Sequence, residues 1–159
     1  MQVTIRKATP VDAAALATFR WGPRSEEDAE TGTGRAEFVA SFSAWLVEHL
    51  PTHLPFVAEL DGAVVGMAWL AVAERVPSVD RRYRRFGDVQ SVYVVPELRN
   101  SGIGAALLRE VLAEARRLGL EHVTVHSSDR AVPFYERVGF GHDEHWLRWL
   151  PERIPVVEA

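Results

Sequence analysis

The segment from Asp88 to Leu118 constrains the fold more than any other part of the sequence. Asp88 to Val95 is an apolar-rich run typical of a strand, and Pro96 ends it because proline has no amide to donate to a sheet. A loop with glycines at positions 102 and 104 follows, and Gly104 to Leu118 has the apolar spacing of an amphipathic helix. A strand that leads through a glycine-containing loop into a helix indicates a fold that combines a sheet with helices.

The same kind of periodicity predicts strands and helices on both sides of this segment. Thr9, Pro10 and Asp12 form a helix-start signature, with a hydroxyl at the N-cap, proline at N1 and a carboxylate at N3. The dipeptide Asp61-Gly62 favours a two-residue hairpin turn because it tolerates positive φ. The predicted ranges are strands at 3–5, 55–60, 63–72 and 121–126, helices at 10–19, 38–50 and 131–138, and a last strand pair at 142–150.

The order of these elements predicts a mixed sheet. A helix between strands 88–95 and 121–126 requires a right-handed parallel crossover, whereas the hairpin strands 55–60 and 63–72 are antiparallel. We therefore expect an α/β fold (α+β by some schemes) with a mixed central sheet flanked by about four helices. No repeat, low-complexity run or linker divides the sequence, so we expect one domain over residues 1–159.

Composition and charge exclude several classes of function. The 159 residues are 47% hydrophobic, which is enough for one packed core, and the net charge of −4 gives no general attraction to nucleic acid or anionic membranes. Neither is therefore expected as a partner. With no cysteine, the chain has no disulfide and no cysteine nucleophile, and its six histidines lack metal-ligand spacing, so we expect no metal. No signal-peptide or membrane-spanning pattern is present, which predicts a cytoplasmic protein.

The glycine loop that precedes helix 104–118 is predicted to bind an anion. The first amides of a helix have no internal partner, the helix dipole is positive there, and glycines let a pyrophosphate approach the backbone. A dinucleotide-binding loop would need a third glycine at position 107, where this chain has Leu107. A P-loop would need Gly-Lys-Ser/Thr, which the sequence lacks. The remaining prediction is a nucleotide-like cofactor that carries a diphosphate.

Two motifs in order resemble the GCN5-related N-acetyltransferase (GNAT) family. The first is Arg99-x-x-Gly102-x-Gly104 after a Val-Tyr-Val-Val-Pro strand, and the second is the Phe-Tyr-Glu-Arg-Val-Gly-Phe run at 134–140. The opening strand and helix and the hairpin around Asp61-Gly62 also resemble the family, so the likeness covers nearly the whole chain. It implies a GNAT-like acyl-CoA N-acyltransferase fold, acetyl-CoA as co-substrate and an amine acceptor.

The resemblance also implies roles for particular residues. Tyr135 corresponds to a tyrosine that supports the departing sulfur, and the acetyl group would lie between the strands that end near Val94 and His126. Ser128 stands where many members have an asparagine that contacts the cofactor. Coenzyme A would be bound by the strand end and the loop that follows it, which comprise Val92, Tyr93, Val94, Arg99, Asn100, Ser101, Gly102, Ile103 and Gly104.

The chemistry of acetyl transfer to a primary amine requires removal of a proton. An alkylammonium has a pKa of about 10.4, so on the order of one part in a thousand is nucleophilic at pH 7. The resemblance aligns Asp88 with a glutamate base of histone-modifying members, while Gln90 could order a water for the same purpose. A thiol pKa of roughly 8.5 against about 10 for tyrosine indicates that Tyr135 mainly donates a hydrogen bond to the leaving sulfur.

The sequence leaves the acceptor and some alternatives open. A small-molecule amine and a peptide amine both fit, and homodimers are frequent in similar proteins, with Trp146 and Trp149 as the expected contact region. Two alternative functions are a module that senses acyl-CoA without catalysing a reaction and a structural adaptor. Two charged groups either lie in solvated loops or make contacts. The acidic group could attract a cationic amine and comprises Glu26, Glu27, Asp28 and Glu30. The basic group could reach the coenzyme's phosphates or a partner subunit and comprises Arg81, Arg82, Arg84 and Arg85.

Overall fold

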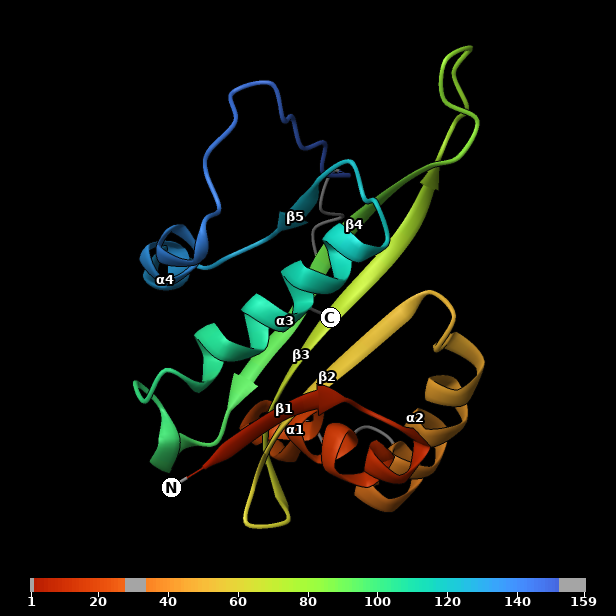
Figure 1. Ribbon diagram of the computed structural model, residues 1–159. Helices are drawn as coiled ribbons and strands as arrows, with labels where there is room; N and C mark the ends of the chain where they lie inside the picture. The colour runs from red at the N-terminus through yellow and green to blue at the C-terminus, as the bar shows by residue number, and fades with distance from the viewer. Residues whose placement is uncertain (1, 28–33, 152–159) are drawn as a thin grey trace, which may run out of the picture.

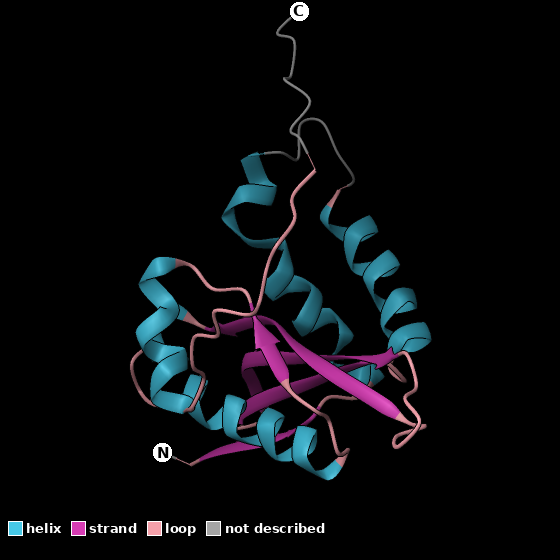
Figure 2. Ribbon diagram, turned by 90° about the horizontal axis from the view of Figure 1, so that it is seen from above, coloured by secondary structure: helices cyan, strands magenta, loops and turns pink. Residues whose placement is uncertain are grey.

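The computed structural model describes residues 2–27 and 34–151, which form a five-stranded sheet with helices on both faces (Figures 1 and 2). The sheet order is β1-β2-β3-β4-β5, with antiparallel pairs from β1 to β4 and a parallel pair between β4 and β5. This confirms the predicted mixed sheet and four helices. The elements are β1 (Val3–Lys7), α1 (Ala13–Glu27), α2 (Arg35–His49), β2 (His53–Leu60), β3 (Ala63–Arg75), β4 (Arg84–Val94), α3 (Ile103–Arg117), β5 (Val123–Val125) and α4 (Val132–Val138).

The sheet separates two hydrophobic clusters. On one face α3 buries Leu107, Leu108 and Val111 against strand residues such as Leu70. On the other face α1 and α2 bury Leu16 and Leu46 with residues that include Met67 and Trp69. Successive residues of β3 therefore pack into different clusters, because the side chains of a strand alternate between the two faces of the sheet.

The helix-start signature after β1 is confirmed in atomic detail. The Thr9 amide donates to Asp12 Oδ2 at 2.8 Å, and the Arg6 guanidinium donates to both Asp12 oxygens at 2.8 and 2.9 Å. The Arg6 hydrogen bonds hold the pKa of Asp12 below its usual value, against the opposing effect of burial. Asp12 therefore stays ionised and fixes the turn from β1 into α1, although α1 extends past the predicted end at Phe19 with a break in helical geometry at Gly22.

A bulge in β4 shapes the middle of the sheet. Ser91 has a φ of 57°, in the left-handed region, and the β3–β4 register shifts between Met67 and Trp69 at this point. β5 pairs with β4 only from Gly87 to Val89, whereas β4 continues to Val94. The two strands are therefore unpaired beyond Val89, on the side of β4 that leads toward the glycine loop.

The predicted strand pair at 142–150 is wrong, since no strand occurs in this described range. Asp143 instead organises a local turn, with its carboxylate accepting from the His145 amide at 2.8 Å. The run Trp146-Leu147-Arg148-Trp149-Leu150 places apolar residues at adjacent positions, so it lacks the alternation that buries one face of a strand. Trp146 and Trp149 remain 56% and 83% exposed.

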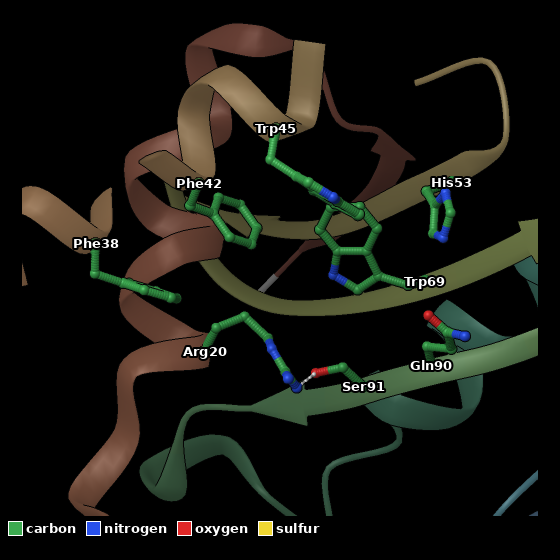
Figure 3. A pocket seen from close by; sticks show the side chains of 8 residues that line it. All are labelled: Arg20, Phe38, Phe42, Trp45, His53, Trp69, Gln90 and Ser91. Carbon is green, nitrogen blue, oxygen red and sulfur yellow. Dashed lines mark hydrogen bonds between the residues drawn. The ribbon is translucent and has the colours of Figure 1, made fainter. Parts of the chain in front are cut away.

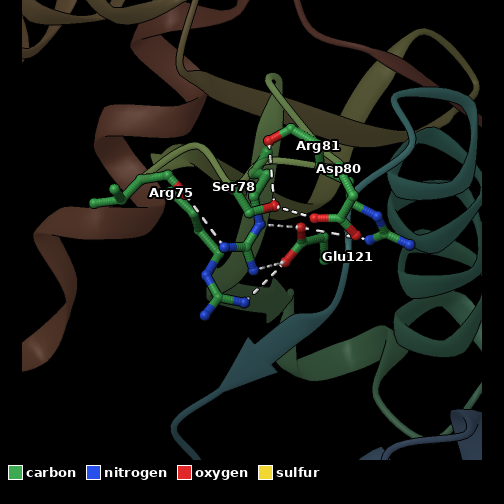
Figure 4. A network of polar contacts seen from close by, with 7 residues as sticks. Arg75, Ser78, Asp80, Arg81 and Glu121 are labelled. Atoms are coloured by element: carbon green, nitrogen blue, oxygen red, sulfur yellow. Dashed lines mark hydrogen bonds and ion pairs between the residues drawn. The ribbon is translucent and has the colours of Figure 1, made fainter.

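The basic residues 81–85 were expected in a loop, but β4 begins at Arg84, so Arg84 and Arg85 belong to the strand. Arg84 lies opposite Arg75 in the β3–β4 ladder, and Glu121 offsets this like-charge pair by accepting from Arg75 at 2.8 Å and from Arg84 Nε at 2.7 Å. Arg81 joins the same carboxylate at 3.5 Å (Figure 4). Chiefly through the Arg84 hydrogen bond, the pKa of Glu121 falls to about 2.

Within the described part of the chain, no helix is long and apolar enough to cross a membrane, and no group of three or more candidate ligands could hold a metal ion. Of the acidic group named above, Asp28 and Glu30 lie outside the described residues, and the side chains of Glu26 and Glu27 are likewise not described.

Candidate active site

The glycine loop forms one wall of a cavity of about 670 Å³ at the N-terminus of α3. Asn100 and Gly102 both have positive φ, 61° and 86°, which turns the loop so that α3 can begin at Ile103. A Cβ at Gly104 would meet the Phe134 ring at 3.2 Å, so glycine allows α4 to approach this loop. We call this the glycine-loop cavity, and its lining residues are Val92, Val94, Leu98, Arg99, Asn100, Gly102, Gly104, Ala105, Arg130, Pro133, Phe134 and Arg137.

The charges of the glycine-loop cavity suit a polyanion. Arg99, Arg130 and Arg137 line it, and no carboxylate is among its lining residues in the described chain. The amides at the start of α3 add the positive end of the helix dipole. A coenzyme A molecule carries a pyrophosphate and a further phosphate, so these residues fit it. The sequence motif identified Arg99, but Arg130 and Arg137 were missed because only the packing of α4 brings them to the loop.

The structure brings together most, but not all, of the predicted cofactor residues. Tyr93 lies on the opposite face of the sheet, stacked on Phe19 at 4.8 Å between ring centroids. Ile103 is buried in the core, and the Ser101 hydroxyl donates to the Leu98 carbonyl. Ser128 does not line the glycine-loop cavity, and its carbonyl accepts the amide of Ala131 at 3.0 Å. The Val94 carbonyl is also engaged, since Arg99 Nε donates to it at 3.1 Å.

A second cavity, of about 480 Å³, lies on the α1 and α2 face of the sheet (Figure 3). Aromatic rings from α2 and β3 form its wall, and β4 supplies polar residues at its edge. We call it the aromatic cavity, and its lining residues are Arg20, Phe38, Phe42, Trp45, His53, Trp69, Gln90 and Ser91. The apolar periodicity of residues 38–50 predicts Phe42 and Trp45 on one face of a helix. No pattern in the sequence indicates that β3 brings Trp69 to them.

Asp88 lies beside the aromatic cavity and contacts it through Gln90. The Asp88 carboxylate accepts from Thr124 Oγ1 at 2.7 Å and from Gln90 Nε2 at 3.2 Å. Gln90 lines the cavity and Asp88 does not. The bulge comes after both residues, so it leaves them on one face of the strand. The two sequence candidates for proton removal are thus hydrogen-bonded to each other.

Tyr135 is placed against β5. It lines a cavity with Thr124, Val125 and Ser127, whereas its neighbour Phe134 lines the glycine-loop cavity. Half-buried between aromatic neighbours, the Tyr135 hydroxyl has a pKa raised by that burial. It therefore stays protonated at neutral pH and can act as a hydrogen-bond donor.

His53 is a further residue that the sequence reasoning did not single out as functional. Its ring lies 5.1 Å from the Trp45 ring between centroids, and His49 is 5.6 Å away. Burial, and secondly the neighbouring His49, lower the pKa of His53. The imidazole is therefore neutral at pH 7 and adds no charge to the aromatic cavity.

This mixed sheet, with its bulged fourth strand and a glycine loop at the start of α3, has the architecture of an N-acyltransferase fold. Residues 16–140 match the model of the acetyltransferase (GNAT) family, and the chain belongs to that family of acyltransferases. The resemblance of the two motifs is thereby confirmed at the level of the family.

Curated relatives differ in how much of their length the chain covers. The chain is 33% identical over 93 residues to glucosamine 6-phosphate N-acetyltransferase of Trypanosoma brucei brucei. This match covers 58% of the chain and 61% of that protein. The chain is also 32% identical over 152 residues to aminoglycoside N(6')-acetyltransferase type 1 of Stenotrophomonas maltophilia. This match covers 84% of the chain and 86% of that protein. It spans only 29% of a similar mycothiol acetyltransferase from Thermobispora bispora.

Solved structures confirm the fold. A protein from Clostridium acetobutylicum described as a predicted acetyltransferase, determined with acetyl-CoA, has a TM-score of 0.71 at 20% identity, and the match covers 94% of this chain and 96% of that one. An acetyltransferase of Trypanosoma brucei has a TM-score of 0.70 at 22% identity, covering 94% of this chain and all of its own. At these identities the likeness concerns the fold alone.

Proposed function

We propose that this protein is an acetyl-CoA-dependent N-acetyltransferase that acts on a primary amine of a small molecule or peptide. One observation carries the proposal. Consecutive residues of β4 line two different cavities, with Ser91 in the aromatic cavity and Val92 in the arginine-lined glycine-loop cavity. A donor and an acceptor would then lie on opposite sides of β4 and would meet where β4 and β5 are unpaired beyond Val89.

The reaction needs no redox partner. Acetyl-CoA, when bound, supplies a thioester whose carbonyl carbon the free amine can attack directly. A nitrogen–carbon bond forms, the carbon–sulfur bond breaks, and the products are an N-acetyl amide, the thiol of coenzyme A and the proton lost by the ammonium. The chain's residues have two tasks, which are to remove a proton from the amine and to stabilise negative charge on the sulfur.

The first task falls to the Asp88–Gln90 pair in this proposal. Gln90 reaches the aromatic cavity and is held by Asp88, so a water bound at Gln90 could pass the proton to the carboxylate. Asp88 is then a positioning and proton-accepting residue behind Gln90. Asp88→Asn keeps the Thr124 hydrogen bond, because an amide oxygen also accepts, but removes the negative charge.

The second task falls to Tyr135. Its hydroxyl is protonated at neutral pH, and the residue lines a cavity together with Val125, the last β5 residue that pairs with β4. We propose that it donates a hydrogen bond to the developing thiolate. Further parts of the proposal are that the reaction takes place in the cytoplasm and that two copies associate through the exposed Trp146 and Trp149.

The test is calorimetric titration with acetyl-CoA, with dephospho-CoA as the comparison ligand, followed by a thiol-release assay with a panel of amines. Released thiol can be read without background because the protein has no cysteine. Micromolar binding together with amine-dependent thiol release supports the proposal. Binding without release for any amine indicates an acyl-CoA-sensing module, and no binding by folded protein rejects a donor site at the glycine loop.

For the proton-removal step, Asp88→Asn is compared with Asp61→Asn, a change at the distant hairpin turn. We expect a fall in kcat on the order of 10² for Asp88→Asn, typical of a lost general base, with acetyl-CoA affinity unchanged. Equal turnover of the two variants would leave Asp88 without a part in the reaction.

A further inference from the structure

The aromatic cavity has one face suited to an apolar ring. Phe42 and Trp45 lie 6.0 and 6.1 Å from Trp69 between ring centroids, and Phe38 lies 5.9 Å from Phe42. The Trp69 indole N–H donates to Met67 Sδ at 3.4 Å, so it is already satisfied inside the core. The wall therefore offers ring faces and edges, which favour an aromatic or bulky apolar group by stacking and by loss of hydrated surface.

The opposite side of the same cavity carries a positive charge. Arg20 is the one permanently charged residue among its described lining side chains, since His53 is neutral at pH 7. Arg20 Nη1 donates to Ser91 Oγ at 3.0 Å, which points the guanidinium at the β4 bulge (Figure 3). The remaining guanidinium donors are suited to a planar carboxylate, which arginine binds in a bidentate manner.

The position of Arg20 limits the kind of amine that can react. In the proposed reaction the amine reaches the bulge from the aromatic cavity, and there it is next to the Arg20 charge. A positive neighbour disfavours a second cation, so a polyamine or a polycationic sugar would be repelled. A carboxylate on the carbon that bears the amine engages Arg20 and removes this repulsion.

We infer that the acceptor is an aromatic α-amino acid, with its ring on the Phe42–Trp45–Trp69 wall, its carboxylate on Arg20 and its α-amine at the Ser91 bulge. This inference rests on the proposed function, because it uses the same transfer of an acetyl group to an amine. A volume of about 480 Å³ lies within the range of cavities that hold small molecules. The acceptor thus differs in charge from the phosphosugar and the aminoglycoside in the names of the two relatives.

The test compares pairs of substrates on pairs of enzymes. L-Phenylalanine and phenethylamine share a ring and an amine and differ by the carboxylate, and spermidine and glucosamine 6-phosphate extend the panel. Arg20→Gln removes the guanidinium, and Arg109→Gln, on the exposed surface of α3, is the control with the same change of net charge. Acetyl-CoA binding by each protein is measured first by calorimetry, and kcat/KM then follows from thiol release.

The inference predicts that kcat/KM for L-phenylalanine exceeds that for phenethylamine by about 10- to 100-fold, the value of a charge-assisted hydrogen-bonded pair. Arg20→Gln removes most of this ratio, while Arg109→Gln keeps it. Trp45→Ala should lower kcat/KM for L-phenylalanine more than for glycine, which has no side chain to bind the wall.

Other outcomes contradict the inference in distinct ways. Faster transfer to spermidine, to glucosamine 6-phosphate or to phenethylamine would overturn the amino-acid assignment and leave the acetyltransferase proposal intact. An unchanged substrate ratio in Arg20→Gln would overturn the role of Arg20. Acetyl-CoA binding without acetylation of any amine in the panel would overturn the inference, and failure to bind acetyl-CoA would reject the proposed function itself.

Discussion

Ser91 and Val92 are consecutive residues of β4, yet Ser91 lines the aromatic cavity and Val92 lines the glycine-loop cavity. The positive φ of Ser91 and the shift of register opposite it have a different effect, which is to bring the consecutive residues Gln90 and Ser91 to the same cavity. Side chains of neighbours alternate in a strand, so Ser91 and Val92 face opposite sides of the sheet, and the pairing of β4 with β5 has already ended at Val89, just before the bulge. The strand thereby forms part of two separate cavities.

The bulge itself can be tested at Ser91. Ser91→Val places a β-branched side chain at positive φ, which costs roughly 1–2 kcal/mol, so the variant should either lose stability or straighten the strand. In both cases kcat should fall, because Gln90 and residue 91 no longer reach the aromatic cavity in the same way. Ser91→Gly tolerates the same φ and loses the same hydroxyl, so it is the control, with a higher Tm and a higher kcat than Ser91→Val.

The glycine loop can be tested with two alanine substitutions that carry the same strain. Gly102 and Gly62 have φ values of 86° and 80°, and a Cβ at either position would meet no atom within 4 Å. Gly102→Ala and Gly62→Ala should therefore lose similar stability, roughly 1–2 kcal/mol, in urea denaturation. In calorimetry, only Gly102→Ala should weaken acetyl-CoA binding. Equal affinities in the two variants would show that the loop does not contact the donor.

The sequence predicted the sheet and the glycine loop better than it predicted the aromatic cavity. Val92 to Gly104 form one continuous motif, so both the elements and their order could be inferred from neighbouring residues. The aromatic cavity depends on contacts between distant segments, such as Phe42 of α2 with Trp69 of β3. Arg84 was assigned to a loop because its charge suggested solvent, and only Glu121, far along the chain, makes its position in a strand acceptable.

The contribution of Tyr135 can be separated from binding. Tyr135→Phe removes a hydroxyl that burial keeps protonated, and loss of one donor to developing negative charge lowers kcat by on the order of 10². Acetyl-CoA affinity should change little, and because the pKa of Tyr135 is raised above its ordinary value of 10.0, the effect should be the same from pH 7 to pH 9. Tyr83→Phe, at a residue 97% exposed, is the control. Unchanged kcat in Tyr135→Phe would remove the role assigned to the hydroxyl.

The ion pairs of Glu114 predict how stability depends on pH. Glu114 is 7% exposed on α3, where Arg117 Nε donates to its carboxylate at 2.8 Å and Lys7 of β1 contacts it at 2.6 Å. These bonds, chiefly that from Arg117, lower the pKa of Glu114 from 4.5 to about 2 in the folded protein. The unfolded chain therefore binds the proton first as pH falls, and the stabilisation present above about pH 4.5 is lost between there and about pH 2.

Glu114→Gln should therefore unfold more easily in urea at pH 7, by about 1 kcal/mol once solvent screening of the exposed Lys7 and Arg117 is taken into account. The difference from the parent protein should shrink as the pH is lowered from 5 to 2.5, because the parent loses the same contribution there. Glu110→Gln, one turn earlier on the exposed side of α3, should show no such convergence. A Glu114→Gln deficit that stays constant across this pH range would mean that the side chain stabilises the β1–α3 contact by packing rather than by charge.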